Sequence, residues 1–387
     1  MKKNGFTLIE LLAVIVILAI IALIVTPVVS GIITSARNSA NARSVEGHIR
    51  NVELAIISDA FAKASGDLAV YDSTSSNGIS NETGIVARGL TIPENDKITC
   101  ETYNIVNGQV TEARGCADYT NTANWHHTYT YTPTEGAVMD ADEVGTAEPA
   151  VTPIATKVTE AGATHMGIVY LDPSRTVINC SATSEITATN TGCKKFYIFG
   201  TTNDSKYKMI MDRNTTAKIE WANEEDYADA GGDEDEYDDN QNTQGPVTVT
   251  KQLTLDTENW IGSPRLITAN EVAAIVGVDG WTNDGSKYFY FGSKTSNGYN
   301  KQDGDEKTRQ QSYHWLFDYT SSCTTYGCQD GKEDSSTDGY WTNDTVTDDT
   351  VVSWCVYNHG GLGNLSAGNG IRFGVRPVIE ISTALID

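Results

Sequence analysis

Glu10 is the first residue whose type and position suggest chemistry. It lies near the start of an N-terminal stretch that reads MKKNGFTLIELLAVIVILAIIALIVTPVV, and the residues from Leu11 to Val25 are all apolar. A carboxylate at the depth of a bilayer core costs about 2.5–3.5 kcal/mol on insertion scales, so it is expected to have a partner of opposite charge. Glu10 is therefore a candidate for a buried ion pair.

Seven cysteines form the second group of reactive side chains. Six of them fall into three close pairs along the chain: Cys100 with Cys116, Cys180 with Cys193, and Cys323 with Cys328. The C-x-x-C spacing typical of zinc sites is absent, and local disulfides fit an exported, loop-rich protein, although spacing alone does not fix the connectivity. Cys355 alternates with apolar residues in VVSWCVYNHGG, which predicts a buried free thiol on a strand.

No pattern in the chain predicts catalysis. A nucleophile–base motif, H-E-x-x-H and a phosphate-binding loop are all missing from the sequence. WTND occurs at Trp281–Asp284 and at Trp341–Asp344, where a core tryptophan followed by a turn is favoured over a calcium-dependent sugar site. We therefore expect no enzyme, no metal site and no cofactor, with calcium left open as a weak ligand.

Acidic residues outnumber basic ones, 51 to 27, and give a net charge of −24. Residues 1–65 hold six Lys/Arg and four Asp/Glu (+2), which leaves −26 on the rest of the chain. Such a charge repels phosphate backbones, so nucleic acid is not an expected partner. Ten acids fall within residues 224–239 without the ligand spacing of an EF-hand, which predicts a solvated, mobile loop in which loose calcium binding is left open.

The element that positions Glu10 is a long helix. The apolar run is long enough to cross a hydrocarbon core, which needs about 20 residues, and the lysines before it place its start on the cytoplasmic side. Removal of the run as a secretory signal, after TPVVSGIITSARNSA, is the alternative. Apolar residues then recur at helical spacing up to a stop near Gly66, at positions 45, 49, 52, 56, 60 and 64. Pro27 is expected to kink or locally melt this helix.

The segment NGFTLIELL resembles the processing and assembly signature of type IV pilins and pseudopilins. The shared pattern is a short basic leader ending in glycine, then phenylalanine, a glutamate four positions on, and an apolar helix with a proline at Pro27. This resemblance covers residues 1–65. It implies that a prepilin peptidase cuts after Gly5 on the cytoplasmic face and methylates the new N-terminus at Phe6. It also implies that Glu10 pairs with the terminal amine of a neighbouring subunit, while residues 11–64 pack the filament.

The sequence predicts an α+β protein with four segments: a leader (1–5), a membrane and amphipathic helix (6–65), a strand-and-loop head with a linker (66–158), and a C-terminal domain (159–387) with the acidic insert 224–239. The linker is expected at residues 134–157, which are rich in small residues, acids and prolines. In the C-terminal domain a Thr-Asn-Asp turn predicts a hairpin, TANE predicts a capping box from Thr268 to Glu271, and a second helix is expected over 306–319.

The C-terminal domain resembles bacterial extracellular domains related to the formylglycine-generating enzyme (sulfatase-modifying factor) and C-type-lectin-like fold. The phrases that carry this resemblance are FYIFG, RLITANEVA, WLFDY, CTTYGC, YWTND and GVRPVIEIS. It implies chain ends that lie close together, a closing strand at 372–382 that pairs beside the first strand, and an anchoring role for Arg376. The metal-binding cysteines of that enzyme do not align with Cys323 and Cys328, so catalysis is not implied.

Together these features predict a pilin-like subunit of a type IV filament. Residues 66–387 would crowd a filament lattice, which favours a minor or tip subunit that displays its C-terminal domain for adhesion. The expected partners are a prepilin peptidase, other pilin subunits, the cytoplasmic membrane and an extracellular glycan or protein. The chain is expected in the cytoplasmic membrane before assembly and at the cell surface afterwards. The alternatives are a pseudopilin of a type II secretion or DNA-uptake system, and a membrane-anchored enzyme or carbohydrate-binding protein that does not polymerise.

Overall fold

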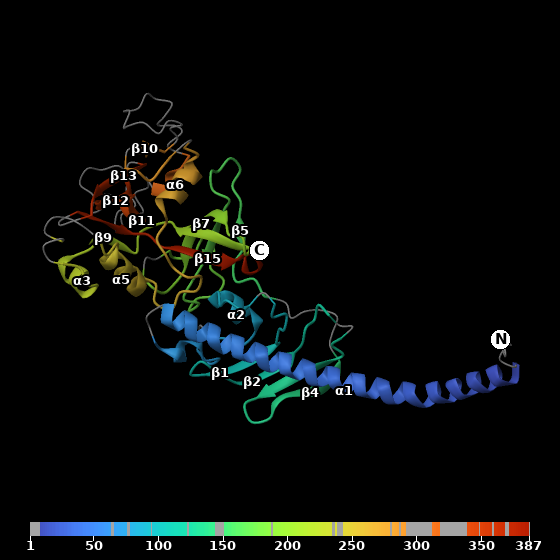
Figure 1. Cartoon of the computed structure of the whole chain (residues 1–387). Helices are drawn as coiled ribbons and strands as arrows, with labels where there is room; N and C mark the ends of the chain where they lie inside the picture. Colours follow the sequence, from blue (N-terminus) through green and yellow to red (C-terminus); the bar gives the residue numbers. More distant parts are fainter. Residues whose placement is uncertain are drawn as a thin grey trace.

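A single helix of 55 residues, α1 (Leu8–Ala62), is the longest element of the chain. At about 1.5 Å per residue it is about 80 Å long. In the computed structural model, its second half lies across the folded part of the molecule and its first half projects away from it with a gentle curve (Figure 1). The structure describes residues 8–62, 66–75, 78–93, 95–121, 124–143, 151–186, 189–233, 237, 243–278, 281–285, 288–291, 312–317, 339–347, 349–357, 360–367 and 371–386.

The helix stays continuous through Pro27, so the local melting predicted at that position is not observed. A proline removes one backbone N–H donor from the helical ladder. Because the turns on both sides keep their own hydrogen bonds, the loss of one donor does not end a helix of this length.

The head, residues 66–143, is built on an antiparallel sheet in the order β1-β2-β3-β4. Two short helices, η1 (Leu68–Tyr71) and α2 (Glu82–Arg88), precede the sheet. The strand bounds are β1 (Thr102–Val106), β2 (Gln109–Cys116), β3 (His127–Thr132) and β4 (Gly136–Glu143). Side chains of β1 alternate between exposed and buried, as a sheet with one covered face requires, and α1 supplies the cover.

In the C-terminal body, residues 151–386, the described residues form two further sheets. The first has the order β15-β8-β7-β6-β5 and is antiparallel throughout. Its strands are β5 (Lys157–Val158), β6 (Gly167–Leu171), β7 (Lys194–Thr201), β8 (Lys206–Met211) and β15 (Val378–Ser382). The predicted hairpin around the Thr-Asn-Asp turn is confirmed by the pairing of β7 with β8.

The second sheet of the body has the order β10-β13-β12-β11-β14-β9, with β11 and β14 parallel. Its strands are β9 (Thr216–Glu220), β10 (Phe289–Tyr290), β11 (Gly339–Val346), β12 (Asp349–Tyr357), β13 (Gly361–Ser366) and β14 (Arg372–Val375). Among its described residues, the body has the helices α3 (Glu224–Asp229), α5 (Val247–Asp256), α6 (Ala269–Val276), α8 (His314–Phe317) and the short η3 (Thr383–Leu385). Most of the predicted helix 306–319 lies outside the described residues. Its described part includes α8.

The capping box predicted at TANE is confirmed at the start of α6. The Thr268 side chain accepts from the Glu271 backbone N–H, and the Glu271 carboxylate accepts from the Thr268 backbone N–H at 3.1 Å. Gly277 ends α6 in the left-handed region, with φ 73°. The Glu271 carboxylate also holds the Arg265 guanidinium at 2.7 Å. Burial opposes ionisation of this carboxyl, but the Arg265 contact and the cap outweigh burial and lower its pKa to about 2.

Two polar stretches are more ordered than the sequence predicted. Residues 136–143, expected as part of a linker, form β4 and pair with β3, because the Thr-rich strand β3 supplies a ladder that composition does not reveal. The start of the acidic insert, expected as a mobile loop, forms α3. Asn223 caps this helix, its first turn holds Glu224, Glu225 and Asp226, and Tyr227 is buried beneath it. Carboxylates in a first turn stabilise a helix through its macrodipole.

The predicted pairing of a single closing strand beside the first strand is wrong. The segment divides at Arg376 and Pro377: β14 pairs with β9 and β11, and β15 pairs with β8. Arg376 is buried between the two sheets and donates to the carbonyls of Met211, Trp315 and Leu316, each at 2.7 Å. Arg376 therefore anchors a crossover from one sheet to the other.

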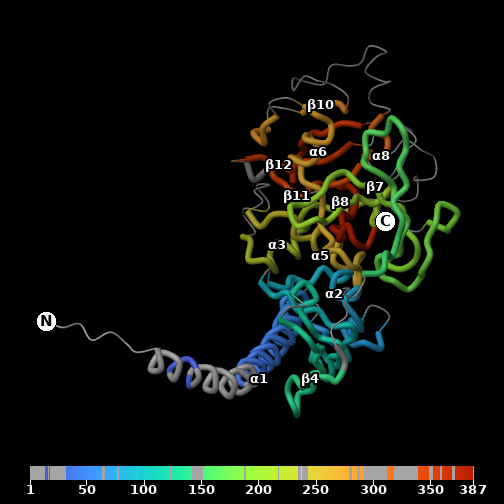
Figure 2. Tube along the Cα trace, turned by 90° about the vertical axis from the view of Figure 1, so that its right-hand side faces the viewer, coloured from blue at the N-terminus to red at the C-terminus, as the bar shows by residue number. Residues whose placement is uncertain are grey.

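The chain end does return to the start of the body, where the Ile154 backbone N–H donates to the Leu385 carbonyl at 2.9 Å. At the same level, helix α2 joins the head to the body. Its Ile85 belongs to the core under α1, whereas its Ala87 belongs to the core of the five-stranded sheet. The Thr152 backbone N–H also donates to the Thr83 hydroxyl at 3.2 Å. The fold is thus a mixed α+β arrangement in which a long helix, a head and a body follow one another (Figure 2).

Candidate assembly helix and its anchor

The residues predicted to direct processing and assembly lie at the far end of α1. Gly5 and Phe6 are outside the described residues, and Glu10 is the third residue of the helix. This end points away from both the head and the body (Figure 1). The structure therefore places Glu10 on a continuous helix but brings no described group of the head or body near it.

The middle of α1 exposes apolar side chains. Ile32 and Ile33 are 64% and 53% exposed, in the part of the helix that precedes the head. Nearer the N-terminus, Val14, Ile15 and Ile17 are also exposed. These exposed apolar side chains, at two places along the first half of the helix, make α1 a candidate for contact with other helices or with lipid.

The second half of α1 is anchored by the apolar face that the sequence predicted. Val45, Ile49, Val52, Ile56 and Ala60 are each 2% exposed or less and share one core with the head sheet. The sixth predicted position, residue 64, lies outside the described residues. Burial of a large aliphatic side chain contributes about 1.5–3 kcal/mol, so this face holds the helix firmly on the head.

A polar cluster, which the sequence analysis did not identify, lies at the edge of this apolar face. His48 is buried, with its Nδ1 3.0 Å from an Asp96 carboxylate oxygen and its Nε2 2.8 Å from the Tyr103 hydroxyl. The Asn51 amide donates to the same Asp96 oxygen at 2.7 Å. Burial opposes ionisation of Asp96, but the bonds from His48, Asn51 and a backbone N–H outweigh burial and lower its pKa. The sequence contained one indication of this role for His48, namely its position three residues after Val45 on the buried face of the helix.

A second polar contact closes the far end of the anchor. The Tyr71 hydroxyl donates to Asp59 of α1 at 2.6 Å. The buried Arg88 guanidinium lies 4.8 Å from the centre of the Tyr71 ring and donates to the Val70 carbonyl at 2.7 Å. Burial, followed by the contact with Asp59, raises the pKa of the Tyr71 phenol. These contacts fix the end of α1 to both η1 and α2.

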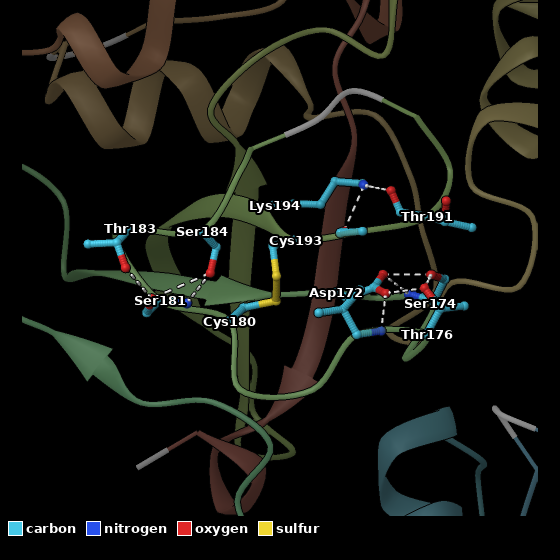
Figure 3. Close-up of a disulfide and its surroundings, with 12 residues drawn as sticks. Asp172, Ser174, Thr176, Cys180, Ser181, Thr183, Ser184, Thr191, Cys193 and Lys194 are labelled. Carbon is cyan, nitrogen blue, oxygen red and sulfur yellow. Dashed lines mark hydrogen bonds between the residues drawn. A yellow bond between two sulfur atoms is a disulfide. The ribbon is translucent and has the colours of Figure 1, made fainter.

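Two of the three predicted cysteine pairs form disulfides. Cys100–Cys116 joins the entry of β1 to the end of β2, and Cys180–Cys193 ties a loop of the body to β7 (Figure 3). The pair Cys323 and Cys328 lies outside the described residues. Cys355 is buried on β12 and forms no disulfide with a described cysteine, as predicted.

The two WTND segments form hydrogen bonds with other segments of the body. Trp341 is fully buried and donates to the Ile219 carbonyl at 2.9 Å. The Asn283 amide donates to the Thr345 carbonyl at 3.0 Å and accepts from the Trp354 indole. The Asp344 carboxylate accepts from the Ala269 backbone N–H at 2.5 Å. In the described residues, no group of three or more His, Cys, Asp or Glu side chains is arranged to hold a metal ion.

Within the same described part of the chain, no helix combines the length and the apolar character needed to span a membrane.

Comparison with known proteins adds a finding about the N-terminus. Residues 1–26 match the family model of the prokaryotic N-terminal methylation motif. The N-terminal segment is type IV pilin-like. Over 86 residues the chain is 34% identical to the prepilin peptidase-dependent protein A of Clostridium perfringens (strain 13 / Type A), across 21% of this chain and 61% of that protein.

No solved structure matches the chain. The body has a mixed α+β architecture. Its likeness to a C-type lectin or a sulfatase-modifying factor stays a prediction.

Proposed function

We propose that the chain is a minor or tip subunit of a type IV filament, cut after Gly5 and methylated at Phe6 by a prepilin peptidase. Before assembly the apolar run would hold the subunit in the cytoplasmic membrane, and after assembly the body would stand at the cell surface. The N-terminal methylation motif at residues 1–26, leading directly into α1, is the observation that carries this proposal.

The anchoring of α1 supports this role. Its second half is fixed to the head by a buried apolar face, while its first half is free to pack elsewhere. A subunit of this shape can add to a bundle of similar helices without any rearrangement of its folded part. The new amine on Phe6 and the Glu10 carboxylate of a neighbouring subunit would then form an ion pair that sets the axial register, as one buried polar group does in a coiled coil.

The size and position of the body support a minor or tip subunit. Both body sheets lie beyond the head, at the opposite end of the molecule from the N-terminus (Figures 1 and 2). In a filament of parallel helices, a body of this size on every subunit would compete for space with the bodies of its neighbours. We infer that it is displayed sparsely and meets an extracellular ligand there.

The test replaces Glu10 by alanine and, as a control, replaces the exposed head residue Glu135 by alanine, so that both variants lose one negative charge. Both should enter the membrane and lose their leader in cells that contain the peptidase. Only Glu10→Ala should be missing from filaments sheared from the cell surface. Incorporation of Glu10→Ala at the level of Glu135→Ala would refute the assembly role.

A further inference from the structure

A cavity of about 370 Å³ lies at the junction of the head and the body. Head residues between Ser73 and Gly84 form one side, and body residues from 152–154 and 171–180 form the other. Small-molecule sites span roughly 300–1,000 Å³ and occur preferentially where domains meet. The cavity is therefore large enough for a small ligand, and both parts of the molecule contribute to it.

Arg175 is the one arginine that lines this cavity, and its guanidinium has no hydrogen-bond acceptor among the described residues. Its side chain makes no hydrogen bond or ion pair there, whereas Arg265 and Arg372 each hold a glutamate. Arg175 is half-buried, and a guanidinium removed from water needs acceptors for its five N–H donors. Burial lowers the pKa of Arg88 on the other side of the junction, and repulsion from the positive charge of Arg175 lowers it further.

The loop that carries Arg175 is held rigidly. One Asp172 oxygen accepts from the backbone and hydroxyl of Ser174 at 2.9 and 2.6 Å, and the other accepts from Thr176 and Val177 at 2.6 and 2.8 Å (Figure 3). Four hydrogen bonds occupy this carboxylate, and it forms no ion pair with Arg175. Arg175 has φ 56°, in the left-handed region. The disulfide Cys180–Cys193 closes the same loop onto β7 (Figure 3). A preorganised loop loses little entropy on binding.

The remaining lining gives the cavity a mixed character. Ile178 and Val177 are 77% and 44% exposed and form an apolar wall. Ser80 and Asn179 also line the cavity, and their side chains make no hydrogen bond with any described residue. An arginine fork matches a carboxylate in geometry, hydroxyl and amide groups match alcohols, and an apolar wall matches the C–H face of a ring.

We propose that this cavity binds a small carboxylate ligand through Arg175, and that the ligand is an acidic sugar. The inference rests on and deepens the proposed display role by naming a ligand class. Its test needs no filament, so its failure can be told apart from a failure of assembly. A peptide with a free C-terminal carboxylate offers the same anion without the ring of hydroxyls, and a second arm of the test distinguishes it.

The experiment titrates detergent-purified full-length protein with glucuronate, with glucose, and with a short N-acetylated peptide that ends in a free carboxylate. Heat of binding is measured for the wild type, Arg175→Gln, Arg175→Lys and Ile178→Asp. Arg114→Gln is the matched control, because Arg114 is an exposed head arginine away from the cavity. We expect saturable binding of glucuronate that weakens with salt, a loss of about tenfold or more in Arg175→Gln and Ile178→Asp, and partial rescue in Arg175→Lys.

Arg114→Gln should bind like the wild type, and glucose should not bind. The absence of saturable glucuronate binding, or equal binding by wild type and Arg175→Gln, would overturn the site. Tighter binding of the peptide than of glucuronate would overturn the sugar class. Because Ile178 is largely exposed, its substitution tests the cavity even if Arg175→Gln does not fold.

Discussion

Replacing Ile56 by alanine tests whether α1 is an integral part of the folded head. Ile56 is fully buried in the core that α1 shares with the head sheet. The packing there is tight, because a Cβ added to Gly108, in the β1–β2 turn with φ 73°, would lie 3.3 Å from the Ile56 Cγ2 atom. The backbone at Gly108 on one side and α1 on the other cannot easily move into the space that the truncated side chain leaves. We therefore expect a loss of about 2–5 kcal/mol in the free energy of unfolding.

The matched control is Leu54→Ala. Leu54 lies two positions earlier on the same helix and is 61% exposed, so its truncation should change the free energy of unfolding by no more than about 0.5 kcal/mol. The assay is urea denaturation of the full-length protein, combined with hydrogen exchange of the α1 amides from residue 45 to 60. Ile56→Ala should lower the midpoint and speed exchange in this segment, and Leu54→Ala should do neither. Equal effects of the two variants would refute the claim that this face of α1 is the anchored one.

Three further predictions concern the polar cluster, a disulfide and a cap. Asp96→Asn should cost about 1.5–3 kcal/mol at pH 7. The pKa of Asp96 in the folded protein lies below its value in the unfolded chain. The stabilisation is therefore present above about pH 4 and is lost as the pH falls through the folded pKa. The difference in urea midpoint between wild type and variant should accordingly shrink in acid. Replacing Cys100 and Cys116 by serine opens a loop of sequence separation 16 and should cost about 3 kcal/mol, seen as a lower urea midpoint for the variant than for the wild type, both under oxidising conditions. Thr268→Ala removes one cap bond of α6 and should cost about 1 kcal/mol by thermal melting, with Thr268→Ser close to wild type.

The parts of the fold that sequence predicted are those that short-range rules govern. The buried face from Val45 to Ala60 follows from helical spacing, and the cap at Thr268 follows from a four-residue motif. The β7–β8 hairpin follows from a turn between two apolar segments. In each of these, the residues that interact are close in sequence, so the pattern contains the information.

The parts that sequence did not predict depend on partners far along the chain. Residues 136–143 become a strand because β3 offers a ladder, and α3 is stable because Tyr227 is buried beside Tyr237 and α5. The closing segment crosses between sheets because Arg376 finds three carbonyls from β8 and α8. His48 shows the same limit, since its partners lie 48 and 55 residues away.

Processing by a prepilin peptidase can be measured by mass spectrometry of the N-terminus of the protein isolated from its host. We expect a mature chain that begins at Phe6, carries a methyl group on its amine and lacks residues 1–5. A chain that keeps its leader in cells that contain a prepilin peptidase, or that begins at any other residue, would contradict the pilin-like processing on which the proposed assembly depends.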